Sequence, residues 1–74
     1  MYTVVGVERK VGVYEGREYD NTILHCTYNK DKCEGVAVCS VKVKTSRLDE
    51  VVEVGASVSF LYDQYGNCAR VDVA

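Results

Sequence analysis

The residues with the clearest chemical potential are aromatic side chains placed at turns of the chain. The sequence contains six tyrosines and one phenylalanine. Tyr14 and Tyr19 bound the segment YEGREY, and Tyr65 directly precedes Gly66 in DQYGN. A tyrosine ring displayed on a turn can stack on a planar base, whereas a ring folded back can cap the open end of a hydrophobic core. The sequence leaves both interpretations open for these three tyrosines.

Basic residues accompany the tyrosines. Lys42 and Lys44 alternate along one predicted strand, so their side chains share a face. Arg9 and Arg17 lie near the first turn. Such cations could follow a phosphate backbone, but charges on a solvated strand face also prevent edge-to-edge aggregation. Because the net charge is −2, binding of a nucleic acid would depend on a local patch rather than on a long-range field.

The sequence offers little machinery for catalysis or metal binding. Its one histidine, His25, lies within a predicted strand, and no nucleophile motif or glycine-rich phosphate loop is present. The cysteines follow the pattern Cys26-x6-Cys33-x5-Cys39 with a distant Cys68, which fits neither a zinc knuckle nor a disulfide framework. We therefore expect no enzymatic activity, no metal and no cofactor. Cys26 and Cys39 are expected to pack as small hydrophobic residues.

The length of the chain, 74 residues, predicts one small domain over residues 1–74. An apolar content of 47% is typical of a folded domain rather than a disordered one. The N-terminal sequence MYTVVGVERK lacks the pattern of a signal peptide, and no apolar run approaches the roughly 20 residues that span a membrane. We expect a soluble, cytoplasmic protein with no membrane partner.

Alternation of apolar and polar residues predicts five β-strands, at about residues 2–14, 19–28, 36–45, 54–62 and 67–73. The apolar phase changes between Val38 and Cys39, which predicts either a bulge in the third strand or a strand that passes around a barrel corner. Between the third and fourth strands, Ser46 could cap one short helical turn, with a plain loop as the alternative.

Five short antiparallel strands in so small a chain predict an all-β fold. The most economical arrangement is a small barrel of the OB or SH3-like type, closed or partly open. The residues expected inside this barrel are Val5, Val7, Leu24, Cys26, Val41, Val58, Phe60 and Val71.

Two short stretches resemble the single-stranded DNA-binding, helix-destabilising proteins of filamentous phages, which are small OB-fold barrels. In EGREYDNTILHC, Gly16, Arg17 and Tyr19 reproduce the family pattern of a glycine, a basic residue and an aromatic residue before a strand with a buried cysteine, here Cys26. VGASVSFLYDQYG is similar to the final hairpin of the family, with the tip Gln64-Tyr65-Gly66.

This resemblance implies a sequence-tolerant single-stranded DNA-binding protein of a phage, plasmid or conjugative element, with a role in DNA replication. It implies a homodimer formed in part by the last hairpin, with Tyr65 stacking on DNA held by the neighbouring subunit. The candidate nucleic-acid-binding residues are Arg9, Arg17, Tyr19, Lys42, Lys44 and Tyr65. The alternative is a non-catalytic barrel that binds another protein through the face carrying Ser57, Ser59 and Leu61.

Overall fold

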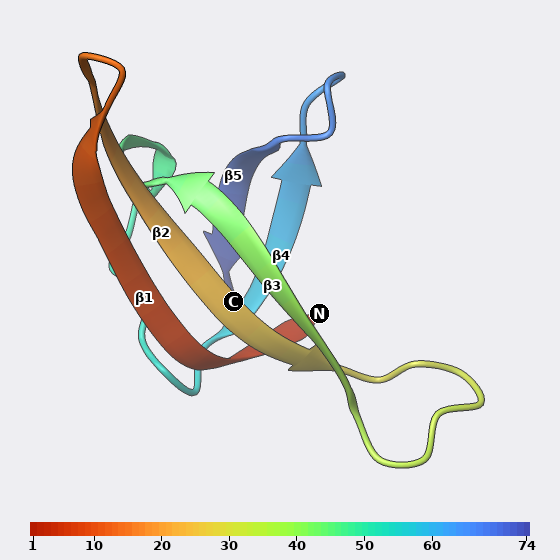
Figure 1. The fold of residues 1–74 in the computed structure, drawn as a ribbon. Helices are drawn as coiled ribbons and strands as arrows, with labels where there is room; N and C mark the ends of the chain where they lie inside the picture. Colours follow the sequence, from red (N-terminus) through yellow and green to blue (C-terminus); the bar gives the residue numbers. More distant parts are fainter.

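The structure, a computed structural model that describes residues 1–74, consists almost entirely of β-strands. These are β1 (Tyr2–Tyr14), β2 (Arg17–Tyr28), β3 (Ala37–Lys44), β4 (Ser57–Tyr62) and β5 (Cys68–Val73). They form one antiparallel sheet in the order β3-β2-β1-β4-β5. The sheet curls so that β5 approaches β3 without pairing with it (Figure 1). The all-β antiparallel class is confirmed, and the sheet stops short of closing into a barrel.

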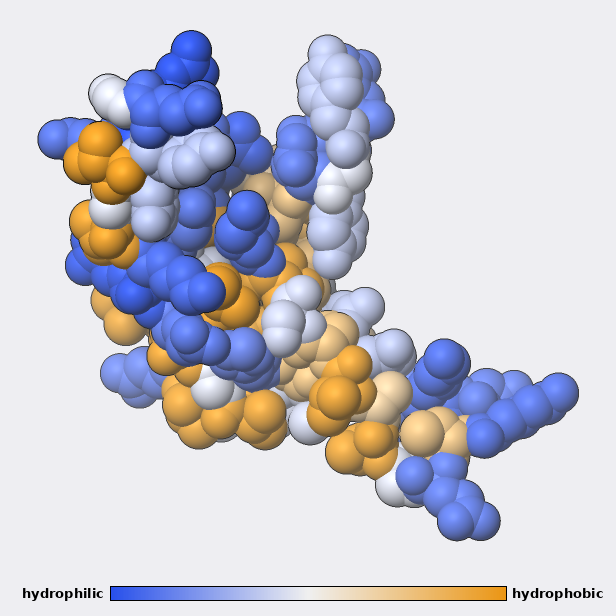
Figure 2. Space-filling model, in the orientation of Figure 1, coloured by the Kyte–Doolittle hydropathy of each residue, from blue (hydrophilic) through white to orange (hydrophobic).

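Two hairpins and one loop project from the curled sheet (Figure 1). The β1–β2 hairpin turns at Glu15 and Gly16, whose φ angles of 50° and 77° are those of a tight two-residue turn. The β4–β5 hairpin turns at residues 63–67, and residues 29–36 join β2 to β3. Figure 2 shows the two hairpins as separate arms with an open gap between them.

Eight hydrophobic residues form the buried core that holds the two halves of the sheet together. They are Val4, Leu24, Cys26, Val43, Val52, Val58, Cys68 and Val71. The sequence placed Leu24, Cys26, Val58 and Val71 inside, which is confirmed. Two further predicted core residues, Val41 and Phe60, are partly buried and pack against this cluster.

The prediction that Val5 and Val7 lie inside is wrong, because their exposed fractions are 53% and 40%. The register between β1 and β2 shifts between Val4 and Gly6, which marks a β-bulge. The bulge turns Val5 out of the core, whereas Val7 lies opposite Leu24 on the core-side face and is exposed because it borders an open hollow there. Val4 takes the core position, opposite the buried Cys26.

The predicted bulge in the third strand is absent. β3 pairs with β2 in one continuous register from Ala37 to Lys44. Val43 is buried in the core, and Cys39 packs against it. The two valines that broke the pattern, Val36 and Val38, are simply exposed to solvent. The apparent change of phase came from two solvent-exposed valines, one on the edge strand β3 and one in the loop just before it.

The segment between β3 and β4 contains the only helical structure, a 3-10 turn η1 (Thr45–Arg47). The predicted short helical turn is therefore confirmed, but Ser46 lies inside it and Lys44 is the N-cap, without a side-chain hydrogen bond. No helix has the length and apolar character needed to cross a bilayer. β4 begins at Ser57 rather than at residue 54, which leaves Val54 exposed in the preceding loop.

The four cysteines are reduced thiols in different surroundings. Cys26 and Cys68 are buried, and this burial raises the pKa of each thiol. Cys39 packs against the core, opposite Cys26 across the β2–β3 ladder, and Cys33 is exposed. The expectation that Cys26 and Cys39 pack as small hydrophobic residues is confirmed.

Candidate nucleic-acid interface

An open hollow lies where the outer face of β2 and β3 meets the beginning of β5. We call it the Tyr19 groove. Its lining residues are Tyr19, Asn21, Lys42, Lys44, Arg47, Asn67 and Cys68. The groove brings together three of the residues predicted from the sequence, Tyr19, Lys42 and Lys44. None of its lining side chains is acidic.

The strand register explains why these side chains share a face. Asn21 pairs with Lys44, and Ile23 pairs with Lys42 across the β2–β3 ladder. Residues directly opposite in an antiparallel pair project to the same side of the sheet. The intervening residues, such as Leu24 and Val43, project to the other side and form the core. Because one face of β2 and β3 is buried in the core, Lys42 and Lys44 must lie on the opposite, solvent-exposed face.

Tyr19 lies against a glycine that gives its ring room. Its cross-strand partner is Gly12, and a Cβ added at Gly12 would lie 2.6 Å from the Tyr19 Oη and 2.8 Å from its Cζ. The outer part of the ring thus occupies the space above the glycine. The residue remains 41% exposed, so the rest of the ring is open to a ligand. The pairing of Gly12 with Tyr19 in the hairpin register accounts for this role of the glycine.

The cations of the groove differ in how they are held. Lys42 and Lys44 form no ion pair, so their charges are available to an anion. Arg47 donates from Nη1 to the carbonyl oxygen of Cys68 at 3.3 Å, which ties the guanidinium to the start of β5. A second hollow, bordered by Tyr19 and Lys44, also contains Glu18 and Asp20. Positive charge therefore dominates only on the side of the groove that faces β5, because Glu18 and Asp20 lie near the other side.

Arg9 does not belong to this group, because it projects from the opposite face of the β1–β2 hairpin. Its Nε donates to Asp20 Oδ1 at 3.0 Å and its Nη2 to Oδ2 at 2.5 Å. Asp20 also accepts a hydrogen bond from Thr45 Oγ1 at 2.7 Å. The bonds from Arg9 and Thr45 lower the pKa of Asp20 from 3.8 to about 2. The guanidinium of Arg9 is therefore paired with Asp20, which largely neutralises the charge of Arg9.

The pairing of Asp20 predicts a loss of stability in acid. Between pH 4 and pH 2 the unfolded state binds a proton at Asp20 that the folded state rejects, because the folded pKa is about 2. The stabilisation is complete above the ordinary pKa and is lost as the pH falls through the folded one. Asp20→Asn should flatten this part of a plot of melting temperature against pH. Identical slopes for the variant and the wild type would contradict the assignment.

The remaining predicted residues lie on the two hairpins, outside the groove. Arg17 begins β2 opposite Tyr14 and is exposed. Tyr65, at the tip of the β4–β5 hairpin, is 78% exposed. The carboxylate of Asp63 accepts hydrogen bonds from the backbone N–H groups of Tyr65 and Asn67 at 2.9 and 3.0 Å, which orders this turn. The rings of Tyr14 and Tyr65 are both exposed to solvent, so neither ring caps the core.

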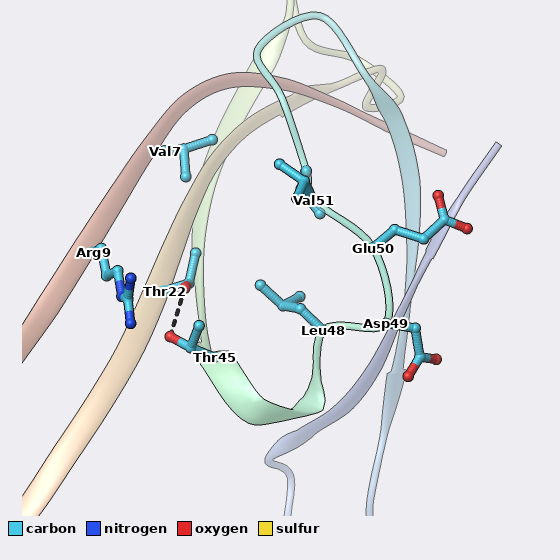
Figure 3. Close-up of a pocket in the computed structure, with 9 residues that line it drawn as sticks. Val7, Arg9, Thr22, Thr45, Leu48, Asp49, Glu50 and Val51 are labelled. Atoms are coloured by element: carbon cyan, nitrogen blue, oxygen red, sulfur yellow. Dashed lines mark hydrogen bonds between the residues drawn. The ribbon is translucent and has the colours of Figure 1, made fainter.

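A hollow on the other face of the sheet is a weaker candidate. Figure 3 shows Val7, Leu48 and Val51 pointing into the space between β1 and the loop after η1. The hydroxyls of Thr22 and Thr45 are 2.8 Å apart at its floor. This hollow contains no aromatic ring, and its one cation is the paired Arg9. It is better described as the open margin of the core.

A polar line crosses the outer face of three strands. His25 Nδ1 is 2.8 Å from Ser40 Oγ, and its Nε2 contacts the carboxylate of Glu8. A serine, a histidine and a carboxylate in line are the components of some hydrolases. The hollow beside this line, which Val5 and Val38 border, has no cation or amide in its lining that could stabilise an oxyanion. We assign the line to cross-strand stabilisation.

A comparison with known proteins found no matching family model, no similar curated protein and no similar solved structure. The interpretation of the Tyr19 groove therefore depends on its own geometry.

Proposed function

We propose that the protein binds single-stranded nucleic acid, without sequence selectivity and without catalysis, through the Tyr19 groove. The observation that carries this proposal is the juxtaposition of a half-exposed aromatic ring with Lys42 and Lys44, two cations that have no acidic partner. Proteins that bind single strands combine stacking surfaces with a basic groove that follows the backbone. The two amides of the groove, Asn21 and Asn67, can accept and donate hydrogen bonds to sugar or base.

In this proposal each type of side chain has a separate task. A base stacks on the exposed part of the Tyr19 ring, and every base has a suitable face, which makes the interaction tolerant of sequence. Lys42 and Lys44 are two residues apart, which is about 6.6 Å along a strand. They therefore meet different points of a bound phosphate backbone. Because the overall charge is −2, affinity comes from these local contacts and is sensitive to salt.

The site extends, in this proposal, to the exposed residues of the hairpins. Arg17 lies on the same strand face as Tyr19 and contributes a phosphate contact. Tyr65 acts as a second stacking ring. We infer that the curled sheet is a partly open barrel of the OB type, and the lining of the Tyr19 groove from β3 and the start of β5 agrees with a binding site at the opening. The resemblance to filamentous-phage proteins supports single-stranded DNA as the ligand and a homodimer that involves the β4–β5 hairpin.

A titration of labelled oligo-dT tests the proposal. The double variant Lys42→Ala/Lys44→Ala should bind more weakly at low salt. Its plot of log affinity against log salt should be shallower by about 1.4, from about 0.7 per phosphate contact on a single strand. The control is Lys30→Ala/Lys32→Ala, which removes the same charge from the loop after β2. It should retain the wild-type affinity and slope.

Two outcomes would overturn the proposal. One is equal loss of affinity in both double variants, since the net charge alone would then explain binding. The other is no binding of oligo-dT at micromolar protein and low salt. That result would favour the alternative, a protein-interaction module whose surface includes Ser59 and Leu61, both exposed on β4.

A further inference from the structure

β1 leaves most of one edge without a partner. β2 pairs with β1 from Thr3 to Tyr14, except at the bulge at Val5, whereas β4 pairs only with Tyr2 and Thr3. Val4 adds backbone hydrogen bonds to Gly55 and Ala56 in the loop before β4. Beyond Val4, the second edge of β1 has no backbone partner. An unpaired edge of this length is a template for another strand.

The sequence of this free edge is symmetric about Arg9 except for the opposite charges at positions 8 and 10. Residues 5–13 read VGVERKVGV, with Val-Gly-Val on both sides and one acidic and one basic residue flanking the centre. Antiparallel pairing of two copies about a two-fold axis at Arg9 places Val7 opposite Val11 and Gly6 opposite Gly12. It also places Glu8 opposite Lys10 twice, once on each side of the axis.

The hydrogen-bonding pattern of β1 permits this register. The two-residue turn at Glu15 and Gly16 makes Tyr14 and Arg17 a hydrogen-bonded pair. Hydrogen-bonded and non-bonded positions then alternate along the hairpin. The backbone N–H and C=O groups of Arg9 consequently point to the free edge, together with those of the residues two positions away on each side.

Charge selects this register from its neighbours. Only registers that pair outward-pointing residues with each other can form a ladder. The two nearest alternatives are centred on Glu8 and on Lys10, and each places a charged residue opposite its own copy. The register centred on Arg9 places Arg9 opposite itself, but the guanidinium of each copy is already paired with Asp20. It is therefore the register in which every charged residue has an opposite charge beside it.

Exposed valines on this hairpin give the pairing an apolar component. Val7, Val11 and Val13 lie on one face of β1 and are exposed in the single chain. Figure 2 shows hydrophobic surface along the side of the molecule formed by β1. In the paired register, Val7 of each copy meets Val11 of the other on this face. Apolar cross-strand pairs of this kind stabilise a sheet.

We propose that the free edge of β1 is a self-association surface, at which two copies of this chain join antiparallel about Arg9 into one continuous sheet. This interface does not involve the β4–β5 hairpin, and it meets the Tyr19 groove only at Gly12, on which the Tyr19 ring lies. It is independent of the proposed binding of nucleic acid.

Reversal of the two flanking charges tests the proposal by sedimentation velocity, at low salt and without nucleic acid. Glu8→Lys places two lysines opposite each other at both sites of the interface, and Lys10→Glu places two glutamates there. Each single variant should raise the dissociation constant for self-association about tenfold, because two attractive pairs become repulsive. The double variant Glu8→Lys/Lys10→Glu restores both pairs and should associate like the wild type.

Glu8→Lys also removes the contact of Glu8 with His25 in its own chain, so a mixture of the two single variants provides the control for folding. In a mixed pair, every lysine at these positions meets a glutamate, so an equimolar mixture should associate more strongly than either variant alone. This gain cannot come from a folding defect, because neither chain is altered by mixing. A wild-type protein that is monomeric up to about 1 mM would overturn the proposal. Self-association that is equal in the wild type, both single variants and their mixture would overturn it as well.

Discussion

Leu24→Ala is expected to lower the free energy of unfolding by about 2–5 kcal/mol, the cost of a cavity in a core that cannot collapse around it. Leu24 is completely buried at the centre of a core of eight residues. The total free energy of unfolding expected for a chain of this length is roughly 4–11 kcal/mol. The variant should therefore lose much of its stability, which urea denaturation followed by circular dichroism measures directly.

Val38→Ala is the matched control for this experiment, because it also shortens an aliphatic side chain in the β2–β3 part of the sheet. Val38 is 74% exposed, and its loss should change the free energy of unfolding by less than about 0.5 kcal/mol. Similar losses in the two variants would show that the core is not where the structure places it. They would also remove the physical reason for the orientation of the lysines on the opposite face.

The strands could be predicted from the sequence because alternation of apolar residues persists along most of them. The errors occur where one backbone irregularity changes which face a residue takes. The bulge between Val4 and Gly6 moved Val5 out of the core, and valines alone do not locate a bulge. The exposed Val38 of β3 and the exposed Val36 just before it imitated a change of phase that the register does not contain.

The candidate site was predictable only where its residues lie on one strand or on paired strands. Lys42 and Lys44 share a face because they are two residues apart, and the β2–β3 register adds Tyr19 to the same side. Arg9 was grouped with them by its nearness to the turn. Its partner Asp20 is eleven residues away in sequence and close only across the hairpin. Asn67 reaches the groove through the curl of the whole sheet, which no local pattern reports.

Tyr19→Ala should weaken the binding of oligo-dT by about 1–3 kcal/mol, the contribution of one stacked base, which is roughly 5- to 150-fold in affinity. The melting temperature should change little, because the ring is half-exposed and outside the core. Tyr19→Phe should bind almost normally, since stacking requires the ring and not the hydroxyl. Tyr14→Ala is the matched control on the same hairpin, and this exposed ring does not line the groove.

Tyr65 is measured in the same titration as the second proposed ring. Tyr65→Ala should also lower affinity by about 1–3 kcal/mol, with no effect on melting, because the side chain is displayed at a hairpin tip. Tyr65→Phe should bind like the wild type. A Tyr65→Ala variant with unchanged affinity would restrict the site to the Tyr19 groove. A Tyr19→Ala variant with unchanged affinity would remove the groove from the proposal.

Gly12→Ala tests whether binding depends on where the Tyr19 ring lies, because this variant keeps the ring but displaces it. The added Cβ would lie within 3 Å of Tyr19 Oη and Cζ, so the ring must move off the strand, while the backbone at position 12 needs no positive φ. Glycine loses more conformational entropy on folding than alanine does. Replacing it by alanine in a strand therefore stabilises the folded state by roughly 0.5–1 kcal/mol. We therefore expect a variant that melts no lower than the wild type and yet binds oligo-dT more weakly. A variant that binds as tightly as the wild type would show that stacking does not depend on the position of the Tyr19 ring above Gly12.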